Sequence, residues 1–273
     1  RLHLYINTAS KEKMIGSLLK VLNIDNIKLN DLLETCYREY QKEKSIFILD
    51  DQYGYFMDYV KKNLSVCIDY LSFYHLSRRL NDNEDDSGYS LVDTLCKDTS
   101  LSRFLKKYGL TFKYDKYIKM YLNDEEIVPD ECNDYSTVFL RQMFGYEYQD
   151  YSFKGFAFND AIEKNDYCEI LKDGPELFGY LFSFIDSDAL FDEFQSNSQY
   201  YKFEYQVPID DIYFENYDDL TNQEKQYHLV VKALQRLYIY KYDTVEFDDD
   251  NPVIGMIDNQ TLDSKYLVSK EEL

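Results

Sequence analysis

The residues with the clearest chemical potential close an apolar stretch of the sequence. The segment Ser65–Ser77 is dense in aromatic and aliphatic side chains, which predicts a long, buried strand. Its period of two places His75 and Ser77 on one face, and Arg78 and Arg79 follow at its end. An imidazole, a hydroxyl and two guanidinium groups can hydrogen-bond a ribose and pair with a diphosphate. This strand end is therefore a candidate nucleotide site.

A purely structural interpretation of the same residues stays open. His75 can be a satisfied histidine at the rim of the core, and the two arginines can pair with the acidic run Asp82–Asp86. The sequence has only 3 histidines, and His3 and His228 are less suitably placed, so imidazole chemistry would depend on His75. No glycine-rich dinucleotide motif, P-loop, G-x-S-x-G elbow or H-E-x-x-H motif occurs.

A second candidate residue lies on the most regular strand pattern of the chain. From Tyr201 to Ile209, apolar residues alternate with polar ones, so one face is apolar and the other carries Lys202, Glu204 and Gln206. A glutamate in such a position is often simply solvated. Pro208 puts the end of the strand at an edge or a bulge.

Three segments resemble, in this order, the three motifs of diphtheria-toxin-like and PARP-like ADP-ribosyltransferases. They are Tyr74–Ser77 with the sequence YHLS, Gly155–Ala161 with GFAFNDA, and Phe203–Ile209 with FEYQVPI. In that family a His-x-Ser/Thr strand contacts NAD, an aromatic strand stacks on the nicotinamide, and a glutamate on a later strand bonds the ribose. The resemblance covers about a third of the chain.

The resemblance implies a role for each matching residue. It assigns His75 and Ser77 to NAD binding, Phe156 or Phe158 to stacking, and Glu204 to the catalytic carboxylate. Arg78 joins the NAD-binding set through its place at the strand end. NAD would be a substrate, and no metal is implied. The sequence departs from the family at Leu76, where glycine is usual, and at Ala157, where tyrosine is expected.

The chemistry implied by the family is the loss of nicotinamide through an oxocarbenium-like state that the glutamate stabilises, followed by transfer to an acceptor. Such a protein would be a bacterial or phage toxin or defence effector that modifies a macromolecule. The residue usage, rich in Tyr, Asp and Asn and favouring Lys over Arg, is typical of an AT-rich bacterial or viral genome. A degenerate transferase-like scaffold is a further interpretation, which the departures at Leu76 and Ala157 permit.

The charge of the chain restricts its partners. With 51 acidic and 30 basic residues, the formal net charge is −21, which disfavours nucleic acids and anionic membrane surfaces. A protein partner or a small ligand is easier to accommodate. A nucleic-acid acceptor would require the cations Arg78, Arg79, Arg103, Lys106 and Lys107 to gather into a basic cleft.

The same charge supports a non-enzymatic alternative. An acidic inhibitor, immunity factor or decoy would bind a basic partner through the segments Asn81–Asp86, Asp210–Asp211 and Asp248–Asp250. The 5 cysteines show no C-x-x-C pair and no histidine at zinc-ligand spacing, which predicts reduced thiols in the cytoplasm and no metal site. No signal peptide is expected at the start of the sequence, and no apolar run is long enough to span a membrane.

The elements that must position these residues indicate an α+β protein with a mixed, mainly antiparallel sheet core. We expect a helix-rich N-terminal lobe over residues 1–64 and an α+β core over residues 65–273. The lobe would contain a short strand from Leu2, helices capped by Ser10 and Asn30, a short segment at Ile46–Leu49 that fits a strand, and a third helix. In the core we expect a loop at Asn81–Ser90 and helices at Leu91–Lys107, Tyr135–Met143 and Asn222–Leu237. We also expect a hairpin at Leu110–Leu122 and strands at Ser152–Phe158, Tyr238–Phe247 and Val253–Val268. A further helix, capped by Asn159 or Asp160, should follow the strand at Ser152–Phe158.

Overall fold

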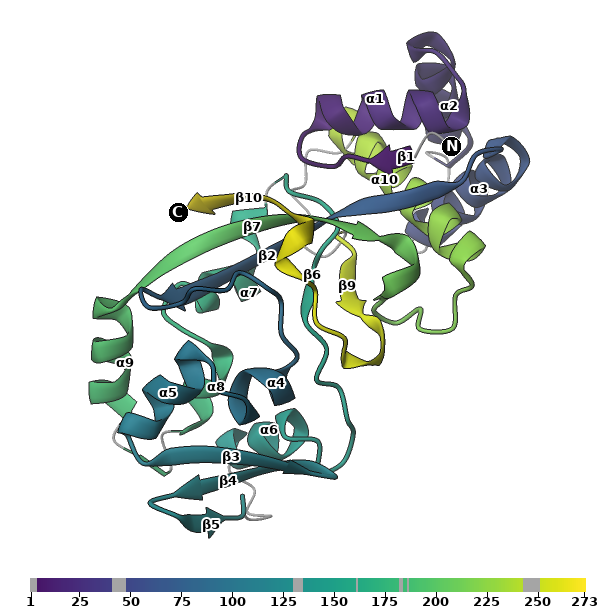
Figure 1. Ribbon diagram of the computed structural model, residues 1–273. Helices are drawn as coiled ribbons and strands as arrows, with labels where there is room; N and C mark the ends of the chain where they lie inside the picture. The colour runs from purple at the N-terminus through teal and green to yellow at the C-terminus, as the bar shows by residue number, and fades with distance from the viewer. Residues whose placement is uncertain are drawn as a thin grey trace. The chain divides into compact units, whose positions relative to one another are not determined.

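The chain divides into two compact units. The computed structural model describes residues 4–40, 48–129, 135–160, 162–181, 184–185, 187–242 and 251–273. Unit 1 comprises Arg1–Tyr74, Gly155–Ile162 and Tyr205–Gly255, and unit 2 comprises His75–Lys154, Glu163–Glu204 and Met256–Leu273. The division falls within two long strands, β2 (Ile68–Leu80) and β7 (Ser198–Pro208) (Figure 1). Helices and a mainly antiparallel sheet confirm the predicted α+β class.

Unit 1 is built around a long buried helix. Helix α10 (Asn222–Tyr242) contacts α1 (Lys11–Leu22), α2 (Asn26–Tyr40) and α3 (Ile48–Asn63). Because neighbours cover several of its sides, α10 buries residues all around its axis rather than along one stripe. The helices expected in the N-terminal lobe all belong to this unit, which also takes residues from the middle and the later part of the chain.

The strands of unit 1 assemble on the first half of β2. Strand β1 (Leu4–Ile6) pairs with β2 in parallel, and β6 (Lys154–Phe156) pairs with it antiparallel, with Tyr74 opposite Phe156. Strands β9 (Val253–Met256) and β8 (Ile212–Phe214) follow β6 in the sheet. A Cβ atom at Gly155 would lie 2.4 Å from the Phe73 ring and 2.4 Å from the Tyr74 carbonyl oxygen, so the close approach of β6 requires glycine.

Unit 2 packs short helices against a small antiparallel sheet. The sheet has the order β3 (Leu110–Asp115), β4 (Tyr117–Leu122) and β5 (Glu125–Ile127). In Figure 1, α4, α5, α6 and α8 gather beside it. The helices are α4 (Leu91–Cys96), α5 (Ser100–Lys107), α6 (Tyr135–Met143), α7 (Asp166–Leu171), α8 (Glu176–Tyr180) and α9 (Ser187–Ser196). A shared aromatic and aliphatic core, which includes Phe104, Phe144 and Phe178, joins several of them to the sheet.

A second strand layer of unit 2 carries the candidate residues. Here the second half of β2 lies beside β7, and β10 (Leu267–Glu272) lies on the other side of β7, at the edge of the sheet. The backbone N–H of Leu273 donates to the Tyr200 carbonyl at 3.0 Å, and Ser269 Oγ contacts Glu204 Oε2 at 3.2 Å. These contacts run in opposite directions along the two chains, so β10 is antiparallel to β7.

Several expected boundaries are wrong for local reasons. The helix expected from Leu91 to Lys107 is two helices, because Thr99 caps a new helix, α5. The expected cap Asn30 lies inside α2, and Asp25 Oδ1 instead accepts from the Lys28 N–H at 2.8 Å. Residues 48–49, expected in a strand, begin α3, and residues 46–47 lie outside the described ranges.

Two further expectations fail near the ends of elements. Neither Asn159 nor Asp160 caps the next α-helix, since Asn165 accepts from the Tyr167 N–H and caps α7. Residues 238–242, expected in a strand, continue α10, because this turn is still packed against neighbouring aromatic rings. The remainder of that expected strand, residues 243–247, lies outside the described part of the chain.

Candidate functional site

A pocket of about 260 Å³ lies in unit 2, at the end of β2. Its wall combines the strand end with the following loop and the α4–α5 turn, and the residues that carry charge or hydrogen-bonding groups there include Arg78, Arg79, Asn83, Thr99, Ser100 and Arg103. Of the five cations that a nucleic-acid acceptor would require in one basic cleft, the three arginines line this pocket, together with the acidic residues Glu84, Asp85 and Asp98. Lys106 and Lys107 are not among the residues that line the pocket.

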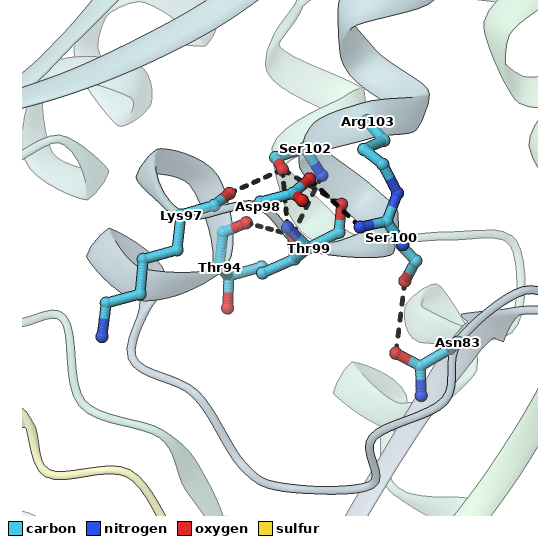
Figure 2. A network of polar contacts seen from close by, with 8 residues as sticks. All are labelled: Asn83, Thr94, Lys97, Asp98, Thr99, Ser100, Ser102 and Arg103. Atoms are coloured by element: carbon cyan, nitrogen blue, oxygen red, sulfur yellow. Dashed lines mark hydrogen bonds and ion pairs between the residues drawn. The ribbon is translucent and has the colours of Figure 1, made fainter.

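The turn between α4 and α5 is held by a reciprocal cap. The Ser102 N–H donates to Thr99 Oγ1 at 3.0 Å, and the Thr99 N–H donates to Ser102 Oγ at 2.9 Å. Ser100 Oγ reaches Asn83 Oδ1 at 3.2 Å and ties the helix start to the loop after β2, as Figure 2 shows. Thr99 and Ser100 line the pocket, so the N-terminal end of α5 lies at its wall. This end of the helix is positive, because the first N–H groups of a helix lack intrahelical acceptors.

Within the described residues, the Arg78 guanidinium forms no ion pair with a carboxylate. Its Nε donates to the Lys172 carbonyl at 2.5 Å, and its Nη1 donates to the carbonyl and hydroxyl oxygens of Ser198 at 3.0 and 3.2 Å. All of these acceptors are neutral. The second terminal nitrogen, Nη2, takes part in none of these bonds.

The other two arginines of the pocket have different surroundings. Arg103 Nη1 lies 3.1 Å from Asp98 Oδ1, and the two side chains are 50% and 83% exposed, so this surface pair contributes at most about 1 kcal/mol. The Arg79 guanidinium stacks on Phe203, 5.2 Å from the ring centroid. Arg103 can therefore exchange its partner for a ligand at little cost, whereas Arg79 is anchored by its stack.

Asp85 brings a fixed negative charge to the same wall. Burial alone would raise the pKa of its carboxyl group, but hydrogen bonds from Tyr89 and Ser87 and the charge of Arg79 outweigh burial and lower the pKa. Asp85 is therefore ionised at neutral pH. The pocket wall thus carries three arginines and three acidic residues, Glu84, Asp85 and Asp98, and offers groups for both an anion and hydroxyl donors.

His75 is a packed, neutral histidine that does not line the pocket. Its Nδ1 donates to the Lys154 carbonyl at 2.8 Å, and its ring lies 4.3 Å from the Phe153 ring centroid. Burial, aided by the charge of Arg79, lowers the pKa of His75 to about 3. Ser77 lies two residues along the same face, and its Oγ is buried without a hydrogen-bond partner in the part of the chain that the structure describes.

The structure does not bring Glu204 to His75. The His75 ring lies 6.4 Å from the Phe203 ring centroid, so His75 and Phe203 share one face of the sheet. Glu204 follows Phe203 directly and therefore points to the opposite face, where Ser269 Oγ lies 3.2 Å from its Oε2. The alternation predicted for this strand is correct, and it is what separates the two residues.

The two aromatic candidates belong to unit 1. Phe156 lies on β6 and is half-buried, whereas Phe158 follows the strand and is 0% exposed. The Phe158 backbone exchanges two hydrogen bonds with the Asn251 side chain, at 2.9 and 2.7 Å, and its ring lies 5.9 Å from the Arg236 guanidinium. In this structure the Phe158 ring is a core contact.

Sequence reasoning missed the α4–α5 turn as part of a site. Asn83, Thr99 and Ser100 were expected in a loop or inside a continuous helix and not beside the arginines. The signal in the sequence was the pair Thr99 and Ser102, whose spacing fits a capping box even though the usual Glu or Gln is replaced by serine. Among the described residues, His, Cys, Asp and Glu form no cluster suited to a metal ion.

The comparisons add no relative. No family model, curated protein or solved structure matches this chain. Over the described ranges, no helix has both the length and the apolar character needed to cross a membrane.

Proposed function

We propose that unit 2 binds a phosphate-bearing nucleotide ligand in its arginine-lined pocket, and that the ADP-ribose part of NAD is that ligand. The observation that carries the proposal is Arg78, which lines the pocket and whose guanidinium bonds only neutral carbonyl and hydroxyl oxygens within the described part of the chain. An arginine held in this way keeps its charge for an anion, and its planar fork suits phosphate oxygens.

The rest of the wall supplies the groups that such a ligand needs. Arg103 and the N-terminal end of α5 add positive charge, and the side chains of Asn83 and Ser100 offer hydrogen bonds to ribose hydroxyls. The Asp85 carboxylate can accept a hydroxyl proton in a hydrogen bond. This combination favours a phosphorylated sugar over a simple inorganic anion, because phosphate alone would leave the hydroxyl-binding groups unused.

The volume of the pocket limits how much of a dinucleotide it encloses. Its volume of about 260 Å³ lies just below the range of roughly 300–1,000 Å³ typical of sites that bury a drug-sized ligand. We therefore expect a diphosphate and one ribose to enter the pocket, while the rest of NAD lies outside it. ADP-ribose and ADP should then bind about as well as NAD does.

The transferase step itself remains a prediction from the sequence resemblance. It assigned the catalytic carboxylate to Glu204 and NAD contacts to His75, which lie on opposite faces of the sheet. The binding of NAD and its turnover to nicotinamide therefore need separate measurements. Incubation of the protein with NAD, followed by measurement of released nicotinamide, tests turnover without assuming which carboxylate takes part.

Calorimetric titration with NAD, ADP-ribose, ADP and inorganic phosphate tests binding. Arg78→Ala should weaken ADP-ribose binding at least tenfold, equivalent to about 1.4 kcal/mol, and Arg78→Lys should restore only part of it. The matched control is Arg38→Ala, which removes an exposed arginine paired with Glu34 in unit 1. Equal affinity of the Arg78→Ala and wild-type proteins, with both folded, would exclude the pocket as the binding site.

A second candidate function is the binding of a basic protein by the acidic surface of unit 1. The exposed residues Asp210, Asp218 and Asp219 take part in no ion pair within the described residues. In the other expected segment, Asn81–Asp86, Asp85 accepts from Tyr89 and Asp86 pairs with Lys270, whereas Asp82 and Glu84 are exposed. Residues 248–250 lie outside the described ranges.

Salt dependence distinguishes this second function. A complex held by these carboxylates should weaken as ionic strength rises, because exposed charges are screened beyond about 10 Å at 0.1 M salt. The triple variant Asp210→Asn, Asp218→Asn, Asp219→Asn should reduce binding of a polylysine probe, while the matched triple variant Asp115→Asn, Glu125→Gln, Glu126→Gln in unit 2 should not. Equal binding by the two triple variants would contradict a specific acidic face.

A further inference from the structure

Strand β10 is held in unit 2 by polar side-chain contacts and not by apolar burial. Apart from Leu267, which is partly buried, every residue of the strand is exposed, including Val268 at 54%. A strand that buries so little apolar surface gains little hydrophobic stabilisation. Its attachment therefore depends on its backbone pairing with β7 and on a few charged side chains.

Lys270 makes the most specific of these contacts. Its ammonium Nζ lies 2.9 and 3.2 Å from the carboxylate oxygens of Asp86, 4.3 Å from the Tyr201 ring centroid and 5.4 Å from the Phe203 ring centroid. Two aromatic rings with a carboxylate form a cage of the kind that recognises an ammonium group. We call the set Tyr201, Phe203 and Asp86 the lysine cage.

The lysine cage is built from elements other than β10. Tyr201 and Phe203 belong to β7, and Asp86 lies in the loop after β2. That loop has its own anchors, since Gly88 exchanges two backbone hydrogen bonds of 2.8 Å with Leu262, and Asn83 Nδ2 donates to the Asp85 carbonyl at 2.8 Å. The cage should therefore persist if β10 leaves.

The register of β10 shows how the edge of β7 receives a strand. Ser269 contacts Glu204, Lys202 Nζ lies 2.9 Å from Glu271 Oε2, and Lys270 between them enters the cage on the opposite face. An incoming antiparallel strand thus needs a lysine facing the cage, with a hydroxyl and a carboxylate on the two neighbouring positions. Strand addition at a sheet edge gives affinity through the backbone and specificity through alternate side chains.

We propose that the β7 edge with its lysine cage is a docking site for an extended, lysine-bearing segment of a protein partner, and that β10 occupies this site as an intramolecular competitor. The charge of the cage fits the chemistry of the partner, because Asp86 already neutralises an ammonium there. This inference does not depend on the pocket: a protein that fails to bind ADP-ribose would still have the cage.

The test uses the full chain and a peptide with the sequence of residues 265–273 as the probe. In the Lys270→Ala variant the cage is empty and β10 is more weakly held, so the labelled peptide should bind at least tenfold more tightly than it binds the wild-type protein. A peptide with alanine in place of Lys270 should lose that gain. Fluorescence anisotropy measures both affinities.

Lys265→Ala is the matched control, because Lys265 also pairs with a carboxylate, Asp263, and lies over an aromatic ring, Tyr266, but outside β10. Hydrogen exchange should be faster in β10 of Lys270→Ala than in β10 of Lys265→Ala, while β3 and β4 exchange equally in both variants and report an intact fold. Equal β10 exchange in the two variants, or equal affinity of Lys270→Ala for the lysine and alanine peptides, would overturn the proposal.

Discussion

Arg78 donates its Nε–H to the carbonyl oxygen of Lys172, the residue that ends α7, at 2.5 Å. The C-terminal end of a helix carries partial negative charge, so this contact favours the guanidinium without cancelling its charge as a carboxylate would. Ser198 holds a second nitrogen of the same group. The function proposed for unit 2 depends on this arrangement, in which neutral oxygens hold the guanidinium of a residue that lines the pocket.

The ion pair between Asp98 and Arg103 should compete with ligand binding. Asp98→Asn removes the carboxylate and leaves Arg103 free to contact a phosphate, so the affinity for ADP-ribose should rise severalfold, in keeping with the value of about 1 kcal/mol or less for an exposed pair. Glu34→Gln, which frees Arg38 in unit 1, is the control and should change nothing. An unchanged or weaker affinity in Asp98→Asn would show that Arg103 does not reach the ligand.

Glu204 should be dispensable for ligand binding. Its carboxylate contacts Ser269 on the face of the sheet opposite to His75, so Glu204→Gln should leave the dissociation constant for ADP-ribose unchanged within error. As a surface change it should alter the free energy of unfolding by less than about 0.5 kcal/mol. Loss of NAD turnover in a folded Glu204→Gln protein would instead support the role that the family resemblance assigned to this residue.

Gly155 should tolerate no side chain. A Cβ atom there meets the Phe73 ring and the Tyr74 carbonyl at 2.4 Å, and backbone cannot move aside cheaply, so Gly155→Ala should lower the free energy of unfolding by about 1–3 kcal/mol. Gly16→Ala is the matched control: nothing lies within 4 Å of the added methyl in helix α1, so it should stabilise by up to about 1 kcal/mol. Urea denaturation measures both, and similar effects of the two changes would contradict the packing described for β6.

His75 should make the protein less stable in mild acid. Its pKa is lowered to about 3 in the folded chain, whereas an unfolded histidine has a pKa of about 6.5, so the unfolded state binds the proton more readily. The stability that His75 contributes is therefore fully present above about pH 6.5 and is lost as the pH falls toward about 3. His75→Gln should reduce the pH dependence of unfolding in this window, and an NMR titration that finds the His75 imidazole protonating near its ordinary pKa would contradict the prediction.

Strong local patterns made much of the fold predictable from the sequence. The alternation of Phe203, Tyr205 and Val207 with polar residues places the apolar side chains in the core, as expected. The hairpin at Leu110–Leu122 also forms as predicted, because Lys116 adopts the left-handed backbone conformation that a tight turn between the strands needs. In both cases residues close in sequence determine the outcome.

What the sequence could not predict depends on contacts between distant residues. The apolar stripe of α10 gave no sign that the helix continues to Tyr242, since the stacking of Tyr242 on Tyr37 of α2 is a tertiary contact. Likewise, the neutral oxygens that hold Arg78 come from Lys172 and Ser198, far along the chain. The acidic run that follows Arg79 was expected to pair with the arginines: the charge of Arg79 does act on Asp85, whereas Asp86 pairs with Lys270, near the end of the chain.

The most direct test of the proposed function observes the Arg78 guanidinium itself during a titration with ADP-ribose. In ¹⁵N NMR spectra of the arginine side chains, assigned by comparison with Arg78→Lys, the Arg78 Nε–H resonance should shift with ligand concentration while that of Arg38 stays in place. Binding of ADP-ribose that leaves the Arg78 resonance unmoved, or no binding at millimolar concentration, would contradict the proposal.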